Sequence, residues 1–378
     1  MASTPMDIDD VPSTTITPTL NITRGSNSAT PLVSTVSEVI SNFRPTKLFT
    51  RDDVKEGRPN PHILSIDFDN QGDLCMTSES DETIQLYNVK EGRHDKTLFS
   101  KKYGVKLAKF THTASTIIYA STKENHAIRY LSAHDNTFLR YFEGHEESVT
   151  NLSMHPGTDN FISCSADNSV CLWNIDTKQF TGRLFLNAPT LSAWDPSGVT
   201  FAIACPLSGT ILLYDYKNYH KGPFSSFDLI KVLGPAEAEA GLKGWTKLQF
   251  SNDGKHILLG SRGKGHFLLD AFDGTLKAFL RKPNGSTRRR APDENDNPNI
   301  EGSGECCFSP DGRYVLSGGK ADIAVWDTLA APNGNKILDP VHILEEKREA
   351  AVVQYNPRYN MLATGDQELV FWLPDPHA

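Results

Sequence analysis

The chain repeats one short pattern seven times, and this repetition restricts its fold more than any other feature. In each copy, an aromatic or large apolar residue ends an apolar run, and a second such residue follows 17 to 20 positions later. The second residues of successive copies are 41 to 57 positions apart. A fixed internal spacing with variable connections indicates one repeated structural unit. The pairs are Phe68 and Tyr87, Phe110 and Tyr130, Met154 and Trp173, Trp194 and Tyr214, Phe250 and Leu269, Phe308 and Trp326, and Tyr355 and Trp372.

Each unit has the pattern of short β-strands joined by tight turns. Several first residues open a turn that closes on glycine, as in Phe308-Ser-Pro-Asp-Gly312, where Pro and Asp favour the turn and Gly accepts a positive φ. A β-rich stretch follows, then a polar turn such as residues 166–168, then a third strand such as residues 169–173. A fourth strand, for example residues 138–142, leads into the next unit. This order predicts an all-β fold, a seven-bladed β-propeller.

The third unit also carries polar residues at characteristic positions. His145 follows a glycine at its start, Ser163 lies in its second strand, Asp167 lies in the next turn, and Trp173 ends its third strand. This set resembles the WD-repeat family, in which Asp, His, Ser or Thr, and Trp hydrogen-bond in series. A buried indole N–H and a buried hydroxyl need partners, and such a series satisfies both. We therefore expect this network in the third blade, and mainly apolar packing in the other blades.

The composition excludes several classes of protein. A formal net charge of −8 does not suit a dedicated nucleic-acid binder, which needs a basic face. The sequence has no apolar run of about eighteen residues, so we expect no membrane span. The N-terminus lacks the features of a secretory signal peptide, and the six cysteines form no Cys-x-x-Cys pair. We therefore expect an intracellular protein with reduced core cysteines, no metal and no cofactor.

The chain divides into a tail and one repeat domain. Residues 1–34 are rich in Ser, Thr and Pro without periodicity, so they are predicted to be disordered. Their Thr-Pro pairs are either phosphorylation sites or an unselected feature of the tail. Residues 35–378 are predicted to form the propeller. Its last unit has only three strands, so we expect residues 47–50, within the segment 35–59, to add the fourth and close the ring, because open sheet edges invite mispairing.

An irregular stretch interrupts the repeats at residues 281–301. It carries five basic and four acidic residues, with Pro, Gly and Asn between them. Its arginine triplet, residues 288–290, is either a nuclear-import or nucleic-acid patch or part of a solvated loop. In the second case the stretch is a flexible insertion between the fifth and sixth blades.

The sequence contains no recognisable catalytic constellation. His145-Glu146 lacks the spaced second His of a zinc protease. The glycine-rich stretch at residues 260–266 lacks the spacing and the strand-to-helix context of a phosphate-binding loop. A Gly-x-Ser-x-Gly elbow is also missing. We therefore expect no enzyme activity, and we interpret the propeller as a rigid disc for peptide and protein docking.

Several stretches that propeller architecture does not dictate resemble one WD-repeat subfamily. It is the small subunit of COMPASS, the Set-one-type methyltransferase of histone H3 lysine 4, known in fungi as Swd-two. The similarity runs from about residue 39 to residue 374, whereas the family predicts nothing for the tail or for residues 281–301. The stretches include Ser100-Lys-Lys-Tyr-Gly-Val105, Ala127-Ile-Arg-Tyr-Leu-Ser132, Lys221-Gly-Pro-Phe224 and Phe371-Trp-Leu-Pro374.

This resemblance implies a non-catalytic adaptor in the nucleus. In the family, the propeller holds a short N-terminal segment of the SET-domain methyltransferase and helps to link the complex to transcribing RNA polymerase II. The same subunit serves in mRNA cleavage and polyadenylation assemblies and in a complex with protein phosphatase one. We therefore expect partners of these kinds, and neither membrane binding nor direct nucleic-acid binding.

The top face of the propeller, where a fourth strand connects to the first strand of the next blade, is the expected docking surface. Aromatic residues are typical anchors of an interface, and lysines suit an acidic or phosphorylated partner. The alternative interpretation of each candidate is an ordinary exposed loop residue. For position 245, the alternative is a core residue that begins the fifth blade. The candidate contacts are Lys101, Lys102, Tyr103, Glu147 and Trp245.

Two other functions are compatible with the pattern. An enzyme would need acid and base groups that converge at the central funnel, and the sequence reveals none. A direct reader of the phosphorylated RNA polymerase II tail would need converging cations there. The candidates for such a cluster are Lys101, Lys102, Lys123, Arg129 and Lys247.

Overall fold

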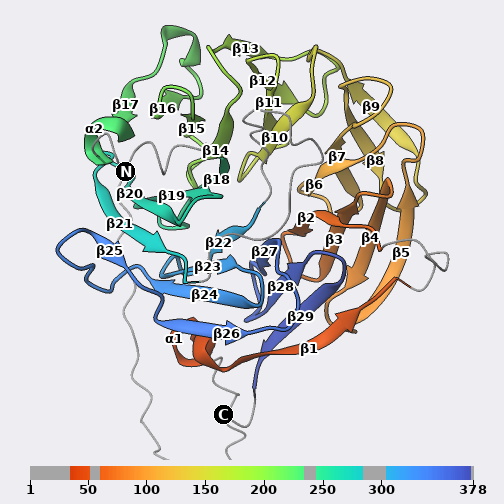
Figure 1. The fold of residues 1–378 in the computed structure, drawn as a ribbon. Coiled ribbons are helices and arrows are strands. Elements are labelled where there is room, and N and C mark those ends of the chain that lie inside the picture. The colour runs from red at the N-terminus through yellow and green to blue at the C-terminus, as the bar shows by residue number, and fades with distance from the viewer. Residues whose placement is uncertain (1–34, 52–59, 234–243, 284–303, 376–378) are drawn as a thin grey trace, which may run out of the picture. The chain divides into compact units, whose positions relative to one another are not determined.

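The computed structural model describes residues 35–51, 60–233, 244–283 and 304–375. The predicted disordered tail and the arginine triplet therefore lie outside the described residues. Residues 36–378 form one compact unit, whose described part contains seven sheets arranged around a central axis (Figure 1). The chain is a seven-bladed β-propeller, as the repeats predict.

Each of the first four blades is an antiparallel sheet of four consecutive strands, with the innermost strand first. Blade 1 contains β2 (Ile63–Phe68), β3 (Leu74–Glu79), β4 (Thr83–Asn88) and β5 (Arg93–Phe99). Blade 2 contains β6 (Lys106–Phe110), β7 (Thr116–Ala120), β8 (Ile128–Ser132) and β9 (Phe138–Phe142). Blade 3 contains β10 (Val149–Met154), β11 (Asn160–Ser165), β12 (Ser169–Asn174) and β13 (Gly182–Phe185). Blade 4 contains β14 (Leu191–Trp194), β15 (Thr200–Cys205), β16 (Thr210–Asp215) and β17 (Ser225–Asp228).

The last three blades depart from this simple order. Blade 5 contains β18 (Trp245–Phe250), β19 (His256–Ser261), β20 (Gly265–Asp270) and β21 (Leu276–Arg281), and the short strand β25 (Ile337–Leu338) pairs with β21 in parallel. Blade 6 contains β22 (Cys306–Phe308), β23 (Tyr314–Gly318), β24 (Asp322–Asp327) and β26 (His342–Glu345). Blade 7 contains β27 (Val352–Tyr355), β28 (Leu362–Gly365), β29 (Leu369–Pro374) and β1 (Phe43–Phe49).

In the described ranges, four short helices accompany these strands. The helix α1 (Val36–Val39) and the 3-10 helix η1 (Ile40–Asn42) precede β1, whereas the 3-10 helix η2 (Tyr219–Lys221) and the helix α2 (Leu229–Leu233) flank β17. No helix in the described part of the chain is both long enough and apolar enough to cross a membrane.

The sequence repeat corresponds to a register row across each blade. The first residue of every pair ends an innermost strand, and the second lies in a third strand. In blade 3, Met154 is the partner of Phe161, which in turn is the partner of Trp173. In six blades, both residues of the pair lie in one such row of strand partners. In blade 2, the row that starts at the first residue reaches the position after Tyr130. The spacing of the repeat is therefore the length of two consecutive hairpins.

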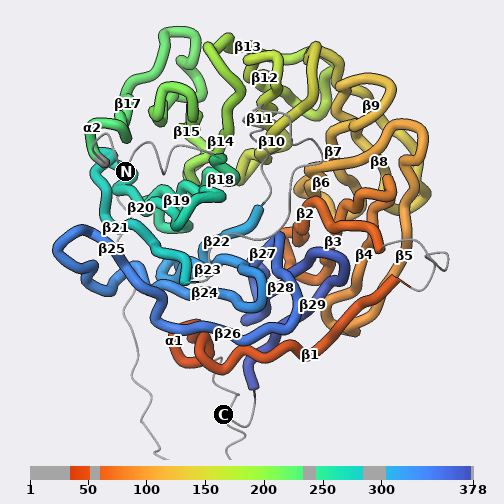
Figure 2. Tube along the Cα trace, viewed as in Figure 1, coloured from red at the N-terminus to blue at the C-terminus, as the bar shows by residue number. Residues whose placement is uncertain are grey.

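The first strand of the chain closes the ring. β1 pairs antiparallel with β29 over its whole length, from Phe43 with Pro374 to Phe49 with Leu369 (Figure 2). This is the place expected for residues 47–50, and it brings the two ends of the propeller into one sheet. The ring of Phe49 lies 4.9 Å from that of Phe371 in blade 7 and 4.7 Å from that of Tyr87 in blade 1. β1 therefore contributes to the packing of two blades.

A buried ion pair joins the residues on either side of positions 284–303. Lys282 Nζ lies 3.3 Å from Glu305 Oε1 and donates a hydrogen bond to the Ser261 carbonyl oxygen at 2.6 Å. Thr246 Oγ1 donates to the same carboxylate at 3.0 Å. Pairing of this kind stabilises a lysine that is removed from water. The expected start of the insertion is therefore corrected: Arg281 belongs to β21, and Lys282 is buried between blades 5 and 6.

All six cysteines are buried free thiols, as their positions in apolar strands predict. Burial raises the pKa of the Cys164 thiol to about 11 and that of Cys306 to about 12. Both thiols are therefore protonated at neutral pH, which makes them poor nucleophiles and poor metal ligands.

Candidate functional site

Four polar residues form a hydrogen-bonded chain inside blade 3. Ser163 Oγ lies 2.6 Å from His145 Nε2 and accepts a hydrogen bond from Trp173 Nε1 at 2.8 Å. At the other side of the imidazole, Nδ1 lies 3.3 Å from Asp167 Oδ2. The carboxylate of Asp167 also accepts hydrogen bonds from two backbone N–H groups in the flanking turns. The structure thus brings together the four residues expected to act in series.

This network has a structural role. Burial lowers the pKa of His145, against the opposing effect of Asp167, so the imidazole is neutral at pH 7. The neutral ring then accepts from the Ser163 hydroxyl, and its Nδ1–H faces both Asp167 Oδ2 at 3.3 Å and Ser169 Oγ at 3.0 Å, so every polar atom in the chain of contacts has a partner. The side chains of His145 and Asp167 are only 1% and 6% exposed. They hold the connection from blade 2 in place and are not available to a partner protein.

The turn at residues 100–104 connects blade 1 to blade 2 on the top face, and contacts with blade 2 fix its shape. Ser100 Oγ lies 2.8 Å from Tyr119 Oη and 3.0 Å from the Gly104 carbonyl oxygen. The carbonyl oxygen of Tyr103 accepts two backbone N–H hydrogen bonds, at 3.0 and 2.8 Å, from the turn between β7 and β8. Gly104 has a φ of 69°, and a Cβ atom there would lie 1.8 Å from Thr122 Oγ1. Glycine is therefore required at this position.

Tyr103 lies over a buried arginine. The guanidinium carbon of Arg129 is 3.3 Å from the centroid of the Tyr103 ring and 4.8 Å from that of Tyr141, and Phe138 meets the edge of Tyr103 at 5.6 Å. Arg129 is 2% exposed, and its Nε donates to Ser121 Oγ at 2.8 Å. A planar guanidinium stacks well on aromatic rings. Arg129 therefore supports Tyr103 from below.

Lysines surround this aromatic group at the surface. Lys102 Nζ lies 5.0 Å from the Tyr103 ring centroid. Lys101 and Lys123 each form an ion pair with an acidic residue in the turn between β3 and β4, at 3.6 and 2.7 Å. Ion pairs at such exposed positions are weak, so an acidic group of a partner can compete for these lysines.

The cations expected for phosphate recognition do not form one cluster. Lys101, Lys102 and Lys123 lie near Tyr103, but Arg129 is buried beneath that ring. Lys247 lines the central channel, and none of the other four borders the same cavity.

The other two candidate contacts have different surroundings. Glu147 is exposed in the connection between blades 2 and 3, where its carbonyl oxygen accepts a hydrogen bond from Ser165 Oγ at 3.0 Å. Trp245 is 0% exposed and packs with Leu191 and Phe267 in the core between blades 4 and 5. Trp245 is therefore a core residue and not a surface contact, because its ring points between two blades.

Two exposed aromatic residues beside Tyr103 did not stand out in the sequence. Phe99, at the end of β5, is 54% exposed, and Tyr141, in β9, is 43% exposed. Asn136, which precedes β9, donates from Nδ2 to the Phe99 carbonyl oxygen at 3.4 Å, so the two strands meet here. The signal in the sequence was the density of aromatic residues in the outer strand 138–142. We call Phe99, Lys101, Lys102, Tyr103 and Tyr141 the corner patch.

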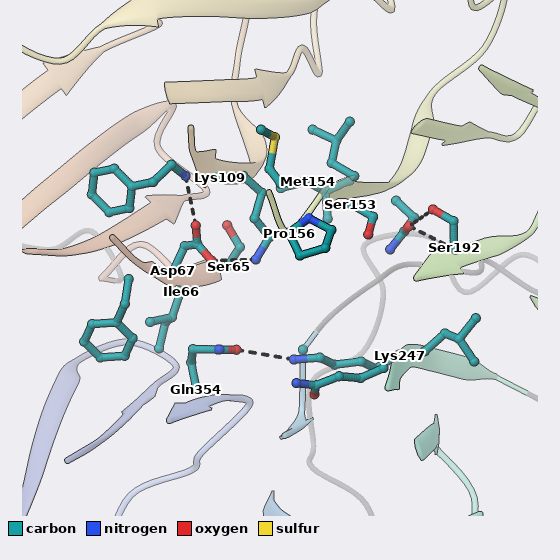
Figure 3. Close-up of a pocket in the computed structure, with 18 of the residues that line it drawn as sticks. Ser65, Ile66, Asp67, Lys109, Ser153, Met154, Pro156, Ser192, Lys247 and Gln354 are labelled. Carbon is teal, nitrogen blue, oxygen red and sulfur yellow. Dashed lines mark hydrogen bonds and ion pairs between the residues drawn. The ribbon is translucent and has the colours of Figure 1, made fainter. Parts of the chain in front are cut away.

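The central channel contains a cavity of about 350 Å³, lined by the innermost strands (Figure 3). On one side, Asp67 Oδ1 lies 2.7 Å from Lys109 Nζ. On the other, Lys247 Nζ lies 3.3 Å from Gln354 Oε1. Over the described ranges, no group of three or more His, Cys, Asp or Glu side chains is arranged to hold a metal ion.

Comparisons with known proteins agree with this architecture. The family model described as "WD domain, G-beta repeat" matches residues 136–174 and 304–327. The first match covers the outer strand of blade 2 and most of blade 3, and the second covers the first three strands of blade 6.

Similar proteins match along nearly the whole chain. WD repeat-containing protein 82 of Drosophila melanogaster is 36% identical over 346 residues, which cover 90% of this chain and 98% of the relative. COMPASS component SWD2 of Saccharomyces cerevisiae is 36% identical over 318 residues, which cover 83% and 91%. Set1 complex component swd2 of Schizosaccharomyces pombe is 29% identical over 373 residues, which cover 90% and 99%. With this identity and coverage, the chain belongs to the family of WD-repeat propellers that includes WD repeat-containing protein 82 and SWD2.

Proposed function

We propose that the chain is a non-catalytic scaffold subunit of a COMPASS-type histone H3 lysine 4 methyltransferase complex and acts in the nucleus. The observation that carries this proposal is its similarity, over most of its length, to two fungal proteins named as Set1 complex and COMPASS components. A propeller with its inner strands packed into a rigid ring suits a docking role.

The corner patch is the proposed site for an N-terminal segment of the SET-domain methyltransferase. Phe99 and Tyr141 offer exposed aromatic area, Tyr103 is held rigidly by Arg129, and Lys101 and Lys102 add positive charge at the rim. Docking an extended segment on such a preformed surface costs mainly the ordering entropy of the segment. We also include cleavage and polyadenylation factors and phosphatase subunits among the proposed partners.

A direct reader of a phosphorylated polymerase tail has weaker support. Lys101 and Lys123 already have acidic partners, and Arg129 is 2% exposed beneath Tyr103. A phosphate group on this surface would have to displace existing ion pairs to reach Lys101 or Lys123, and Arg129 is too buried to offer it a bidentate contact.

Purification of the tagged protein from its own cells, followed by mass spectrometry, tests the scaffold proposal. We expect to recover a SET-domain methyltransferase in stable association. Recovery of neither that enzyme nor polyadenylation factors would contradict the proposal.

The affinity for peptides that tile the N-terminal region of that methyltransferase tests the docking site. It is measured for variants with substitutions on the top face and on the bottom face. We expect Tyr103→Ala or Phe99→Ala to weaken binding by about 2 kcal/mol, roughly thirtyfold, because a central aromatic anchor is lost. Lys101→Ala combined with Lys102→Ala should act mainly on salt-sensitive association.

Phe272→Ala is the matched control for these substitutions. Phe272 is 93% exposed in the turn between β20 and β21, on the bottom face, so its removal should leave peptide affinity unchanged. Circular dichroism and melting temperature verify folding of each variant. The site assignment is wrong if the top-face variants bind normally while bottom-face changes abolish binding.

A further inference from the structure

We infer that the central channel contains an oxyanion-binding site at Lys247, which takes a carboxylate or a phosphate group. Lys247 lies on β18, the innermost strand of blade 5, and borders the cavity of about 350 Å³ (Figure 3). This site is separate from the corner patch, and it does not depend on where the methyltransferase segment binds.

The charged residues that line the cavity favour the binding of an anion. Asp67 is the one carboxylate among the described residues that line it, and Lys109 and Lys247 are the two lysines there. Both oxygens of Asp67 are already engaged: Oδ1 pairs with Lys109 Nζ at 2.7 Å, and Oδ2 accepts the backbone N–H of Phe110 at 2.9 Å. Lys247 is therefore the cation in this wall whose charge is not balanced by a carboxylate of the described channel.

The hydrogen bonding of Lys247 leads to the same conclusion. Gln354 Oε1, a neutral oxygen at 3.3 Å, is its hydrogen-bond acceptor within the described channel. This distance is slightly longer than the usual range for N–H···O bonds, and an ammonium group has three hydrogens to donate. Ser153 and Ser192 line the same cavity, but the Ser192 hydroxyl already donates to Asn151 Oδ1 at 2.8 Å, so Lys247 is the donor on which the site depends. Charge-assisted hydrogen bonds to an oxyanion are stronger than the present contact.

Protonation of Lys247 depends on its surroundings. Burial lowers the pKa of Lys247, and the charge of Lys109 lowers it further, whereas Asp67 opposes this effect. Cys306 and Cys307 on β22 are further titratable neighbours, and burial raises their pKa values to about 12 and about 11, so both are neutral at pH 7. His112 and His155 also line the cavity. An oxyanion beside the amine favours its charged form. Binding should therefore be accompanied by proton uptake wherever the empty site is partly deprotonated.

The cavity size restricts the ligand. Ligand pockets in proteins are typically about 300–1,000 Å³, and this cavity lies at the lower end of that range. It suits a small inorganic anion, or one acidic or phosphorylated side chain inserted by a partner. Both sources present the same chemistry to Lys247.

Calorimetric titration of the full chain with sodium phosphate and with sodium acetate tests the site. We expect saturable binding with proton uptake, detected as a dependence of the heat on the ionisation enthalpy of the buffer at alkaline pH. Lys247→Met should weaken binding about tenfold or more and abolish proton uptake, because the ammonium is lost.

Two further variants control this experiment. Lys277→Met makes the same change at an exposed position of the same blade and should bind as the wild type does. Lys247→Arg keeps the charge, so it should retain binding without proton uptake, because arginine stays protonated. Retained binding by Lys247→Arg also shows that the channel tolerates substitution at this position.

Peptides distinguish the two sources of the anion. If a methyltransferase peptide inserts an acidic residue, its Asp→Asn or Glu→Gln form should bind the wild type more weakly, yet bind Lys247→Met no differently from the parent peptide. If the peptides are insensitive while phosphate or acetate binds, the ligand is a free anion. The inference is overturned if Lys247→Met binds phosphate as the wild type does, or if neither anion binds and no peptide acid depends on Lys247. Failure to recover a methyltransferase would not alter the anion titrations, so the two proposals fail separately.

Discussion

His145 links two parts of blade 3 that the strand ladder does not join. Its imidazole bridges Ser163, inside the sheet, and Asp167, in the turn between β11 and β12. The corresponding hydrogen-bond series in two other blades contain fewer residues. In blade 7, Trp372 Nε1 donates to Thr364 Oγ1 at 2.9 Å. In blade 6, Ser317 Oγ lies 2.8 Å from Nε2 of His266, a residue of blade 5. The series in blade 3 is therefore longer than those in blades 6 and 7, and its imidazole connects the turn to the sheet.

We expect His145→Ala to lower the free energy of unfolding by about 1–3 kcal/mol, because Ser163 and Asp167 lose a buried partner. His134→Ala, at an exposed position, is the matched control and should have no measurable effect. Urea denaturation measures both. An unchanged midpoint for His145→Ala would show that the network adds nothing to stability.

The pH dependence provides a second measure of the same residue. The pKa of His145 is lowered in the folded state, so the unfolded state binds more protons just below the ordinary histidine pKa of about 6.5. The stability that the neutral imidazole provides is thus present above that pH and is lost as the pH falls towards the folded-state pKa. The His145→Ala variant should lose less stability than the wild type over this interval.

At the scale of elements, tight turns determine which side chains reach the top face. The turn at residues 100–104 presents Tyr103 and two lysines because Gly104 takes a positive φ and lies against Thr122. Gly92, in the turn between β4 and β5, also has a positive φ of 59°, but a Cβ atom there would meet nothing within 4 Å. Substitution of each glycine therefore distinguishes the cost of backbone strain alone from the cost of strain combined with steric overlap.

We expect Gly92→Ala to cost roughly 1–2 kcal/mol, the price of the left-handed conformation alone. Gly104→Ala should cost at least about 1 kcal/mol more, because Thr122 must move to admit the new methyl group. Thermal unfolding of both variants measures the difference. Equal losses would indicate that the turn shifts freely, contrary to its bonds with blade 2.

The strands and blades were easier to predict from the sequence than the surroundings of individual side chains. The spacing of the apolar pairs is set by two consecutive hairpins, which are local, so all seven blades were predictable. The surroundings of Trp245 depend on Leu191 of the preceding blade, and those of Lys282 depend on Glu305 beyond a long connection. Neither contact is encoded by neighbouring residues, so a core tryptophan was interpreted as an anchor and a buried lysine as part of a loop.

At the scale of the whole molecule, closure of the ring depends on pairing between distant parts of the chain. β1 supplies the outer strand of blade 7, and residues just after it reach blade 1: Arg51 hydrogen-bonds to Thr83 Oγ1 at 3.2 Å and forms an ion pair with Glu79. Without β1, the long strand β29 would become an open sheet edge beside the first blade. Such an edge is a template for pairing with other chains.

We expect deletion of residues 43–51 to produce an aggregating protein with a lowered melting temperature. Deletion of residues 1–34 is the matched control, because it shortens the same end of the chain but retains β1, and it should leave a monodisperse protein. Size-exclusion chromatography and thermal unfolding distinguish the two. A monomeric 43–51 deletion with unchanged melting would refute the closing role of β1.

The ion pair between Lys282 and Glu305 also affects how the chain tolerates change in length. It holds the residues just before position 284 and just after position 303 beside each other, independently of the residues between them. Each doubling of a loop held at both ends costs only about 0.6 kcal/mol of closure entropy. We therefore expect insertions or deletions here to leave blades 5 and 6 undisturbed. The same position is a natural point for inserting a fluorescent domain that reports on the assembled complex.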